Sequence, residues 1–571
     1  MKRLAWLCLA ACGSSHHLTI PVAPDRSQGF RPPTGEAGRV PPDQVTAPKP
    51  EAIMQEPPVT VVTQTAAPQE LAFPDEEFRN KQPLPSAVRQ FKLPNVKPFT
   101  LKNGAKVYLV EQHALPIVSL DFNFDGGSLT DPKGKEGLAS VCMSMLTEGT
   151  DKLDKIQYAE ALADVASSVS AYATDDSSGL TLGSLTKHLP ATFELFAATL
   201  RSPGLRASDF ERMIKRRIES VRQSKGNPAS VAGRVTGTVL FGPDHPFGTV
   251  VTEETLKAIT LDDCKQYLAT YAKPGNARLF VVGDLTEAQV RAYFEQSLAG
   301  WRGNGPKEPV LRAPQTLPGR IFFVHIPGAA QSQVSMLHFG PKRTAGDYFA
   351  SSMMASVFGG GFSSRINMNL REDKGYSYGA RGGFSYTKQY GTFAASASVR
   401  TDSTYQTLVE IDREVKDLWA GKKPVDNSEL EREKQGAILG LPGQFATAQA
   451  ALGQYRRLVY FSLPLDYFNA YVAKVGQVTA AQVKAAAAKQ LKPGQAVYLV
   501  VGDGDAKMIV RGSATVIDEK TGEKAVVQKD VPYEKNGKQL TLREALVDLA
   551  ARGDVGAGGL VELDTDGHPK M

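Results

Sequence analysis

The sequence has few of the residues from which disulfide frameworks, membrane helices and histidine metal sites are built. Its four cysteines show no CxxC spacing, and no apolar run approaches the ~20 residues that a membrane helix needs. The eight histidines include no pair at the i, i+4 spacing that puts two ligands on one helix face. A net charge of +6 over 571 residues is small and diffuse, which argues against a nucleic-acid-binding chain.

The N-terminus, MKRLAWLCLAACGSS, joins a basic pair to a short apolar run that ends at Cys12. This pattern resembles a bacterial lipoprotein signal, cleaved before Cys12, whose thiol then carries the lipid. We therefore expect a signal peptide over residues 1–12 and an outer-membrane lipoprotein that faces the periplasm or the cell surface. The alternative is an unstructured start with incidental cysteines. We expect the isolated Cys142 and Cys264 to be small buried apolar side chains and no disulfide.

The rest of the chain divides into a tether, two repeated halves and an extension. Residues 13–95 are rich in Pro, Gln, Thr and Ala and lack any period, which predicts a disordered tether. Lys273–Asp284, KPGNARLFVVGD, matches Lys492–Asp503, KPGQAVYLVVGD, at 8 of 12 positions with an offset of 219 residues. A match of this length favours duplication over convergent turn chemistry.

The duplication predicts two homologous α+β domains, each a mostly antiparallel sheet with helices packed on one face. The first would span residues 96–305 and the second 319–506, with a linker at 306–318. Residues 507–571 form an extension to which the sequence assigns no role. It is strand-like at first, and we expect its Gly-rich end to be disordered.

Two segments carry a resemblance to a known family. Val357–Tyr378 reads VFGGGFSSRINMNLREDKGYSY, and Gly137–Thr150 reads GLASVCMSMLTEGT. Together with the motifs FERMIKRRIESVRQSKGNP and GPDHPFGTVV between them, they resemble the M16 (insulinase or pitrilysin) metallopeptidases in content and order. The resemblance implies two M16-type (LuxS/MPP-like) domains.

The family's zinc ligands are absent from the matching positions. The inverted HxxEH motif of the family falls on Ser140, Met143 and Ser144, and its third ligand, a Glu, falls on Arg217. A hydrolytic zinc needs three protein ligands and a carboxylate that accepts a proton from the bound water. Hydroxyls, a thioether and a guanidinium do not supply that set, and the guanidinium would repel the cation. We therefore expect no metal and no other cofactor in this chain.

The family's second-half motif is present, and the resemblance implies that Arg371 and Tyr378 face a substrate peptide. Arginine offers a rigid fork of donors, and a tyrosine hydroxyl can donate to an oxyanion. Both would act in trans on the zinc site of a partner subunit. The alternative is a surface arginine paired with a neighbouring acid, and a core tyrosine. Peptide binding by strand addition and close backbone approach is expected at Ser170, Ala171, Tyr172, Gly359 and Gly360.

These observations predict a non-catalytic M16-family subunit, inactive alone, that forms a heterodimer with an HxxEH-containing subunit. The partner would hold the zinc, and the pair would be an endopeptidase for extended peptides. A homodimer is the other assembly that the sequence allows. The alternative function is a structural or peptide-binding envelope lipoprotein with no role in proteolysis, whereas nothing supports a self-sufficient enzyme of unusual chemistry.

Overall fold

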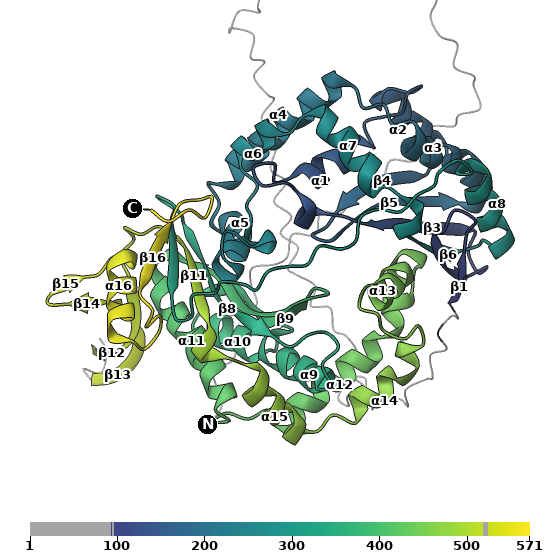
Figure 1. Ribbon diagram of the computed structural model, residues 1–571. Coiled ribbons are helices and arrows are strands. Elements are labelled where there is room, and N and C mark those ends of the chain that lie inside the picture. The colour runs from purple at the N-terminus through teal and green to yellow at the C-terminus, as the bar shows by residue number, and fades with distance from the viewer. Residues whose placement is uncertain (1–92, 94–95, 518–523, 571) are drawn as a thin grey trace, which may run out of the picture. The chain divides into compact units, whose positions relative to one another are not determined.

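The computed structural model describes residue 93, residues 96–517 and residues 524–570 (Figure 1). The predictions for the signal peptide, for Cys12 and for almost all of the tether lie outside these residues. Within the described ranges, no helix is both long and apolar enough to cross a membrane. Two six-stranded sheets organise the described part of the chain.

The first sheet has the strand order β1-β2-β6-β3-β5-β4, in which only β2 and β6 run parallel. Its strands are β1 (Lys97–Thr100), β2 (Lys106–Glu111), β3 (Ile117–Asp125), β4 (Ser168–Ala173), β5 (Ser177–Leu185) and β6 (Ala277–Gly283). The apolar faces of several helices pack against it and form one core. These helices are α1 (Leu138–Met145), α2 (Lys155–Asp164), α3 (Leu189–Arg201), α4 (Ala207–Ser224), α6 (Glu253–Ala258), α7 (Leu261–Tyr271) and α8 (Glu287–Ser297).

The second sheet has the order β16-β7-β11-β8-β10-β9, and its last five positions repeat those of the first. The outer strands differ, because β1 pairs antiparallel with β2 whereas β16 pairs parallel with β7. Its strands are β7 (Ile321–His325), β8 (Gln331–Gly340), β9 (Ser377–Tyr386), β10 (Gly391–Arg400), β11 (Val497–Gly502) and β16 (Leu560–Leu563). The helices of this half are α9 (Tyr348–Gly359), α10 (Arg365–Asn367), α11 (Thr404–Trp419), α12 (Asn427–Gly440), α14 (Tyr471–Gly476) and α15 (Ala480–Gln490). The repeated KPG segments form β6 and β11, which hold the same place in their sheets, so the duplication and the two-domain α+β fold are confirmed.

One helix of each half packs on the sheet of the other half. Helix α5 (Pro228–Phe241) shares a core with β7, β8 and β11, whereas α13 (Ala448–Tyr460) shares one with β2 and β6. The strands between these helices and the outer helices are buried on both faces, as the pattern of β3 shows. The exchange therefore couples the folding of the two halves.

The C-terminal extension is ordered over most of its length, so the prediction of a disordered Gly-rich end is wrong. It contains β12 (Ile509–Ile517), β13 (Lys524–Pro532), β14 (Glu534–Lys535), β15 (Lys538–Gln539), α16 (Leu542–Arg552) and β16. Figure 1 shows it gathered beside the second sheet. Its glycines form turns: Gly553, Gly556 and Gly559 have positive φ and lead from α16 into β16, which pairs in parallel with β7.

Cys142 and Cys264 form a disulfide, which corrects the prediction of two free buried thiols. Both cysteines are fully buried, with Cα atoms 4.8 Å apart although 122 residues separate them in the sequence. The bond joins α1 to α7. Spacing in the sequence gives no sign of the pair, because only the packing of α1 against α7 brings the two thiols together.

Candidate functional site

The positions that align with the family's metal ligands lie together where α1 and α4 pack. Arg217 of α4 donates from Nη1 to Ser140 Oγ at 3.1 Å and from Nη2 to Ser144 Oγ at 2.6 Å. Nη2 also donates to the carbonyl oxygen of Ser140 at 3.1 Å. The two serines lie one turn apart on α1, so the planar guanidinium bridges the face on which the family carries its histidines.

The Arg217 guanidinium has no carboxylate partner within ion-pair distance among the described residues. The nearby buried Glu148 is engaged elsewhere, with Lys155 at 2.6 Å and Arg212 at 2.7 Å. Burial, together with the neighbouring Arg216, lowers the pKa of Arg217 below its ordinary value. Its hydrogen bonds to α1 therefore replace hydration.

A zinc ion does not fit this donor set. The guanidinium occupies the space between the two hydroxyls, and a bound cation would have to displace it. Met143, at the position of the family's catalytic Glu, is fully buried in the core and has no acidic group. These residues therefore carry no metal-assisted step.

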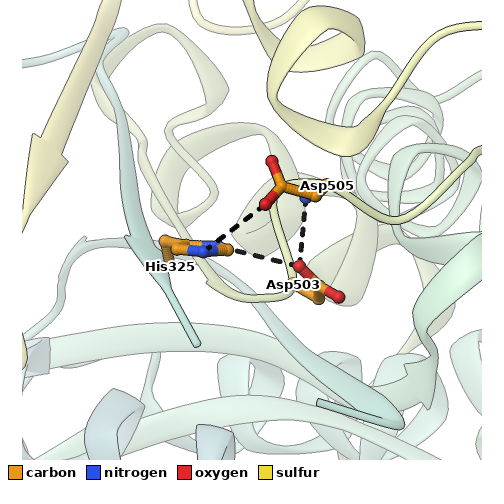
Figure 2. A group of neighbouring side chains, drawn as sticks. All are labelled: His325, Asp503 and Asp505. Atoms are coloured by element: carbon orange, nitrogen blue, oxygen red, sulfur yellow. Dashed lines mark hydrogen bonds and ion pairs between the residues drawn. The ribbon is translucent and has the colours of Figure 1, made fainter. Parts of the chain in front are cut away.

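His325, Asp503 and Asp505 form the one group of three potential metal-ligating side chains in the described part of the chain (Figure 2). His325 and Asp503 already accept hydrogen bonds from backbone N–H groups in and beside the turn that follows β11. His325 Nδ1 accepts from the Gly504 N–H at 2.9 Å, and Asp503 accepts from the backbone N–H groups of Asp505 and Gly328. Because Asp505 is largely exposed and the other two cap backbone donors, this group stabilises a turn.

The structure brings Arg371 and Tyr378 together at the surface. Arg371 lies in a short π-helical turn (Met368–Asp373) and donates from Nη1 to the carbonyl oxygen of Tyr378 at 2.9 Å. Its guanidinium lies 4.8 Å from the centre of the exposed Phe362 ring, and its Nε pairs with Glu372 at 3.1 Å. Tyr378, the second residue of β9, has 88% of its surface exposed, so it is not the core residue of the alternative. The pairing of Arg371 with Glu372 is the one that the alternative expected.

Gly359, one of the two glycines predicted to contact substrate, is buried and has a packing role, whereas Gly360 is exposed. A Cβ on Gly359 would lie 2.1 Å from the backbone nitrogen of Gly382, so this glycine lets α9 approach β9. A Cβ on Gly360 would meet Ser356 of its own helix. The predicted close approach of backbone is therefore real, but it is between α9 and β9.

Strand β4, where strand addition was predicted, is an edge of the first sheet, and Ser170 on it is exposed. Ala171 is half-buried and packs against the first core. The Tyr172 hydroxyl is not available for a ligand, because it donates to Asp121 at 2.8 Å and accepts from Asn123 at 2.9 Å. The backbone edge and the Ser170 side chain are the parts of β4 that a peptide can reach.

Sequence reasoning missed a cavity of about 940 Å³ between the first-half β4–β5 turn and the second-half segments α9, β9 and α13. Its walls carry both charges, including Asp176, Arg343 and Arg456. Arg456 crosses from α13 to pair with the buried Asp121 at 2.8 Å. These side chains come from loops and helix ends far apart in the sequence, and no local motif marks them.

Two models of known protein families match this sequence. Residues 106–238 match the family "Insulinase (Peptidase family M16)", and residues 258–437 match "Peptidase M16 inactive domain". The chain belongs to peptidase family M16. Among curated M16-like proteins, the Helicobacter pylori "Non-peptidase homolog YmxG" is 22% identical over 67% of this chain and 88% of its own length. The Bacillus subtilis "Uncharacterized zinc protease YmxG" is 19% identical over 60% of this chain and 82% of its own length.

Solved M16 structures share the fold. An M16 inactive domain protein from Pseudomonas fluorescens superposes with a TM-score of 0.65 at 26% identity, over 72% of this chain and 98% of that one. A protease from Helicobacter pylori gives a TM-score of 0.66 at 19% identity, over 72% of this chain and all of that one. The M16 fold thus accounts for the two sheets and their helices.

Proposed function

We propose that this M16 protein is a non-catalytic subunit that binds extended peptide and presents Arg371 and Tyr378 to the zinc site of a partner M16 subunit. The observation that carries the proposal is a contrast between two sites. Arg217 fills the metal position, whereas Tyr378 at the second motif is 88% exposed. The printed name of the Helicobacter pylori relative, a non-peptidase homologue, supports inactivity of the chain alone.

The second motif has the chemistry for this role. Nη1 of Arg371 donates to the Tyr378 carbonyl and Nε pairs with Glu372, which leaves the donors of Nη2 for a peptide carbonyl. No protein group among the described residues hydrogen-bonds the Tyr378 hydroxyl, which is thus available to an oxyanion. Zinc and the general base would come from the partner, and this chain would hold no metal or other cofactor.

The surroundings of the motif suit a partner. Phe362, Met368 and Tyr378 are large side chains exposed within the same short segment, and a second subunit would bury them. A homodimer would bring together two chains in which Arg217 fills the metal position, so a heterodimer fits better. Attachment through Cys12 to the outer membrane, on its periplasmic or external side, completes the proposal. The Cys142–Cys264 disulfide supports such an oxidising compartment.

The test is steady-state kinetics on the reconstituted pair. We expect Tyr378→Phe to lower kcat by about 10²–10³-fold, the effect of removing an oxyanion donor, and Arg371→Ala to raise KM as well. Tyr271→Phe and Arg302→Ala are matched controls, because neither residue belongs to the motif. Assembly and melting temperature should stay unchanged in all four variants.

The second candidate is a structural or peptide-binding envelope lipoprotein without proteolysis. The polar cavity between the halves favours it, since peptide binding there needs no zinc. Wild-type kcat/KM in both motif variants would overturn the role of Arg371 and Tyr378, and a chain that binds peptide but forms no active pair with an HxxEH-containing subunit would support this candidate.

A further inference from the structure

The charges that line the cavity between the two halves fall into two classes. Most are paired within the protein, as in Arg278 with Asp125 at 2.8 Å and Lys388 with Glu308 at 3.4 Å. A smaller set has no partner of opposite charge within ion-pair distance among the described residues. This set comprises Arg343, Arg457, Asp175 and Asp176.

Arg343 is the most informative member, because only 8% of its surface is exposed. Its guanidinium stacks on Tyr348, 3.5 Å from the ring centre, and Nη2 donates to the Tyr467 hydroxyl at 2.9 Å. No described carboxylate pairs with it. A buried cation held by aromatic rings keeps its remaining donors in a fixed plane, which is the arrangement that suits a carboxylate.

Asp176 is the corresponding anion, also with 8% exposed. It accepts a hydrogen bond from the Tyr460 hydroxyl at 2.5 Å, and no described cation pairs with it. Burial and the adjacent Asp176 raise the pKa of Tyr460, so this hydroxyl remains a donor to the carboxylate. Asp175 lies next to it on the cavity wall.

The aromatic rings of α13 and the residue after it connect the two charges. The rings of Tyr460 and Phe461 lie 4.7 Å apart, and the Arg343 guanidinium lies 5.9 Å from the Phe461 ring. The unmatched acids, the aromatic wall and Arg343 thus follow one another along the cavity, with Arg457 exposed on the same helix as Tyr460. Lys388 lies 5.3 Å from the centre of the Tyr460 ring, and its charge is matched by Glu308. A ligand with a positive and a negative end would neutralise both buried charges.

We propose that this cavity binds a short peptide by its two free ends, with the carboxylate on Arg343 and the ammonium group at Asp175 and Asp176. The volume of about 940 Å³ is large enough for a ligand of a few residues. The inference deepens the proposed function, on which it rests for the ligand class. The chain would recognise the free ammonium and carboxylate groups of a peptide, and the Arg371–Tyr378 motif would take no part in this binding.

The experiment is calorimetric titration of the single chain, without any partner, with four forms of tetra-alanine. These are the free peptide, the C-terminal amide, the N-acetyl peptide and the doubly blocked peptide. We expect the free peptide to bind, each single block to weaken binding by about 10-fold or more, and the doubly blocked peptide not to bind. Equal affinity for the free and amidated peptides, or no binding of the free peptide at about 10 mM, would overturn the proposal.

Substitutions show which residue binds which end of the peptide. Arg343→Met should abolish the preference for the free acid over the amide while keeping the penalty for N-acetylation, and Asp176→Asn should do the reverse. Arg302→Met, in the exposed segment between the halves, is the matched control and should bind as wild type does. If Arg343→Met does not fold, the peptide series on the wild-type chain still decides. Because no partner is present, failure here is distinct from failure of the kinetic test.

Discussion

The hydrogen bonds of Arg217 to α1 predict a measurable coupling free energy between Arg217 on α4 and Ser144 on α1. The shortest bond, from Nη2 to Ser144 Oγ, is 2.6 Å long and part-buried. A hydrogen bond to a charged group contributes about 1.5–3 kcal/mol, and a neighbouring pair couples by about 0.5–3 kcal/mol. We expect a double-mutant cycle of Arg217→Met and Ser144→Ala to give about 1–2 kcal/mol of coupling.

Arg217→Met and Ser144→Ala should each lower the free energy of unfolding by less than a substitution that leaves a cavity in the core. Arg217→Met removes three hydrogen bonds but also removes a buried charge without an anionic partner, and these effects oppose each other. The assay is urea unfolding of the wild type, both single variants and the double variant. Arg216→Met is the control for loss of charge on α4, since Arg216 makes no hydrogen bond to Ser144 among the described residues and pairs with Glu148 at 3.7 Å. A coupling within about 0.3 kcal/mol of zero would refute the claim that the guanidinium fills this position.

Two further predictions concern stability. His338 is fully buried, donates from Nδ1 to the carbonyl of Phe339, and has a pKa lowered to about 4 by burial. Its unfolded form takes up a proton below about 6.5, so the free energy of unfolding should fall by about 3 kcal/mol between pH 6.5 and 4. His338→Gln should remove this slope, whereas the exposed His568→Gln should keep it. Cys142→Ala should cost about 2–5 kcal/mol of unfolding free energy, and a reductant should destabilise the wild type but not the variant.

Local patterns were sufficient to predict the repeated α+β plan. The KPG repeat indicated the equivalence of the segments that form β6 and β11. The resemblance to the inverted HxxEH motif placed Ser140, Ser144 and Arg217 at one site, and the structure brings them into contact. These features depend on residues close in sequence or on a motif that repeats in register.

Features that depend on long-range packing were out of reach. Helices α5 and α13 each pack on the sheet of the other half. An amphipathic pattern predicts that a helix has a buried face, but it does not predict which sheet that face covers. The disulfide and the ordered end of the extension also depend on contacts between segments far apart in the sequence. The disulfide joins α1 to α7, and β16 pairs with β7. The buried pair of unmatched charges, Arg343 and Asp176, likewise arises where loops of both halves meet.

If Arg217 takes the place of the metal in this chain, the purified full-length protein holds no zinc, and metal analysis measures this. After dialysis against zinc-containing buffer, we expect no stoichiometric zinc and no cleavage of peptide by the chain alone. The same should hold for Arg217→Met, because Ser140, Met143 and Ser144 supply no zinc ligand set. One tightly held zinc ion per chain, lost on substitution of Ser140 or Ser144, would show that Arg217 does not exclude the metal.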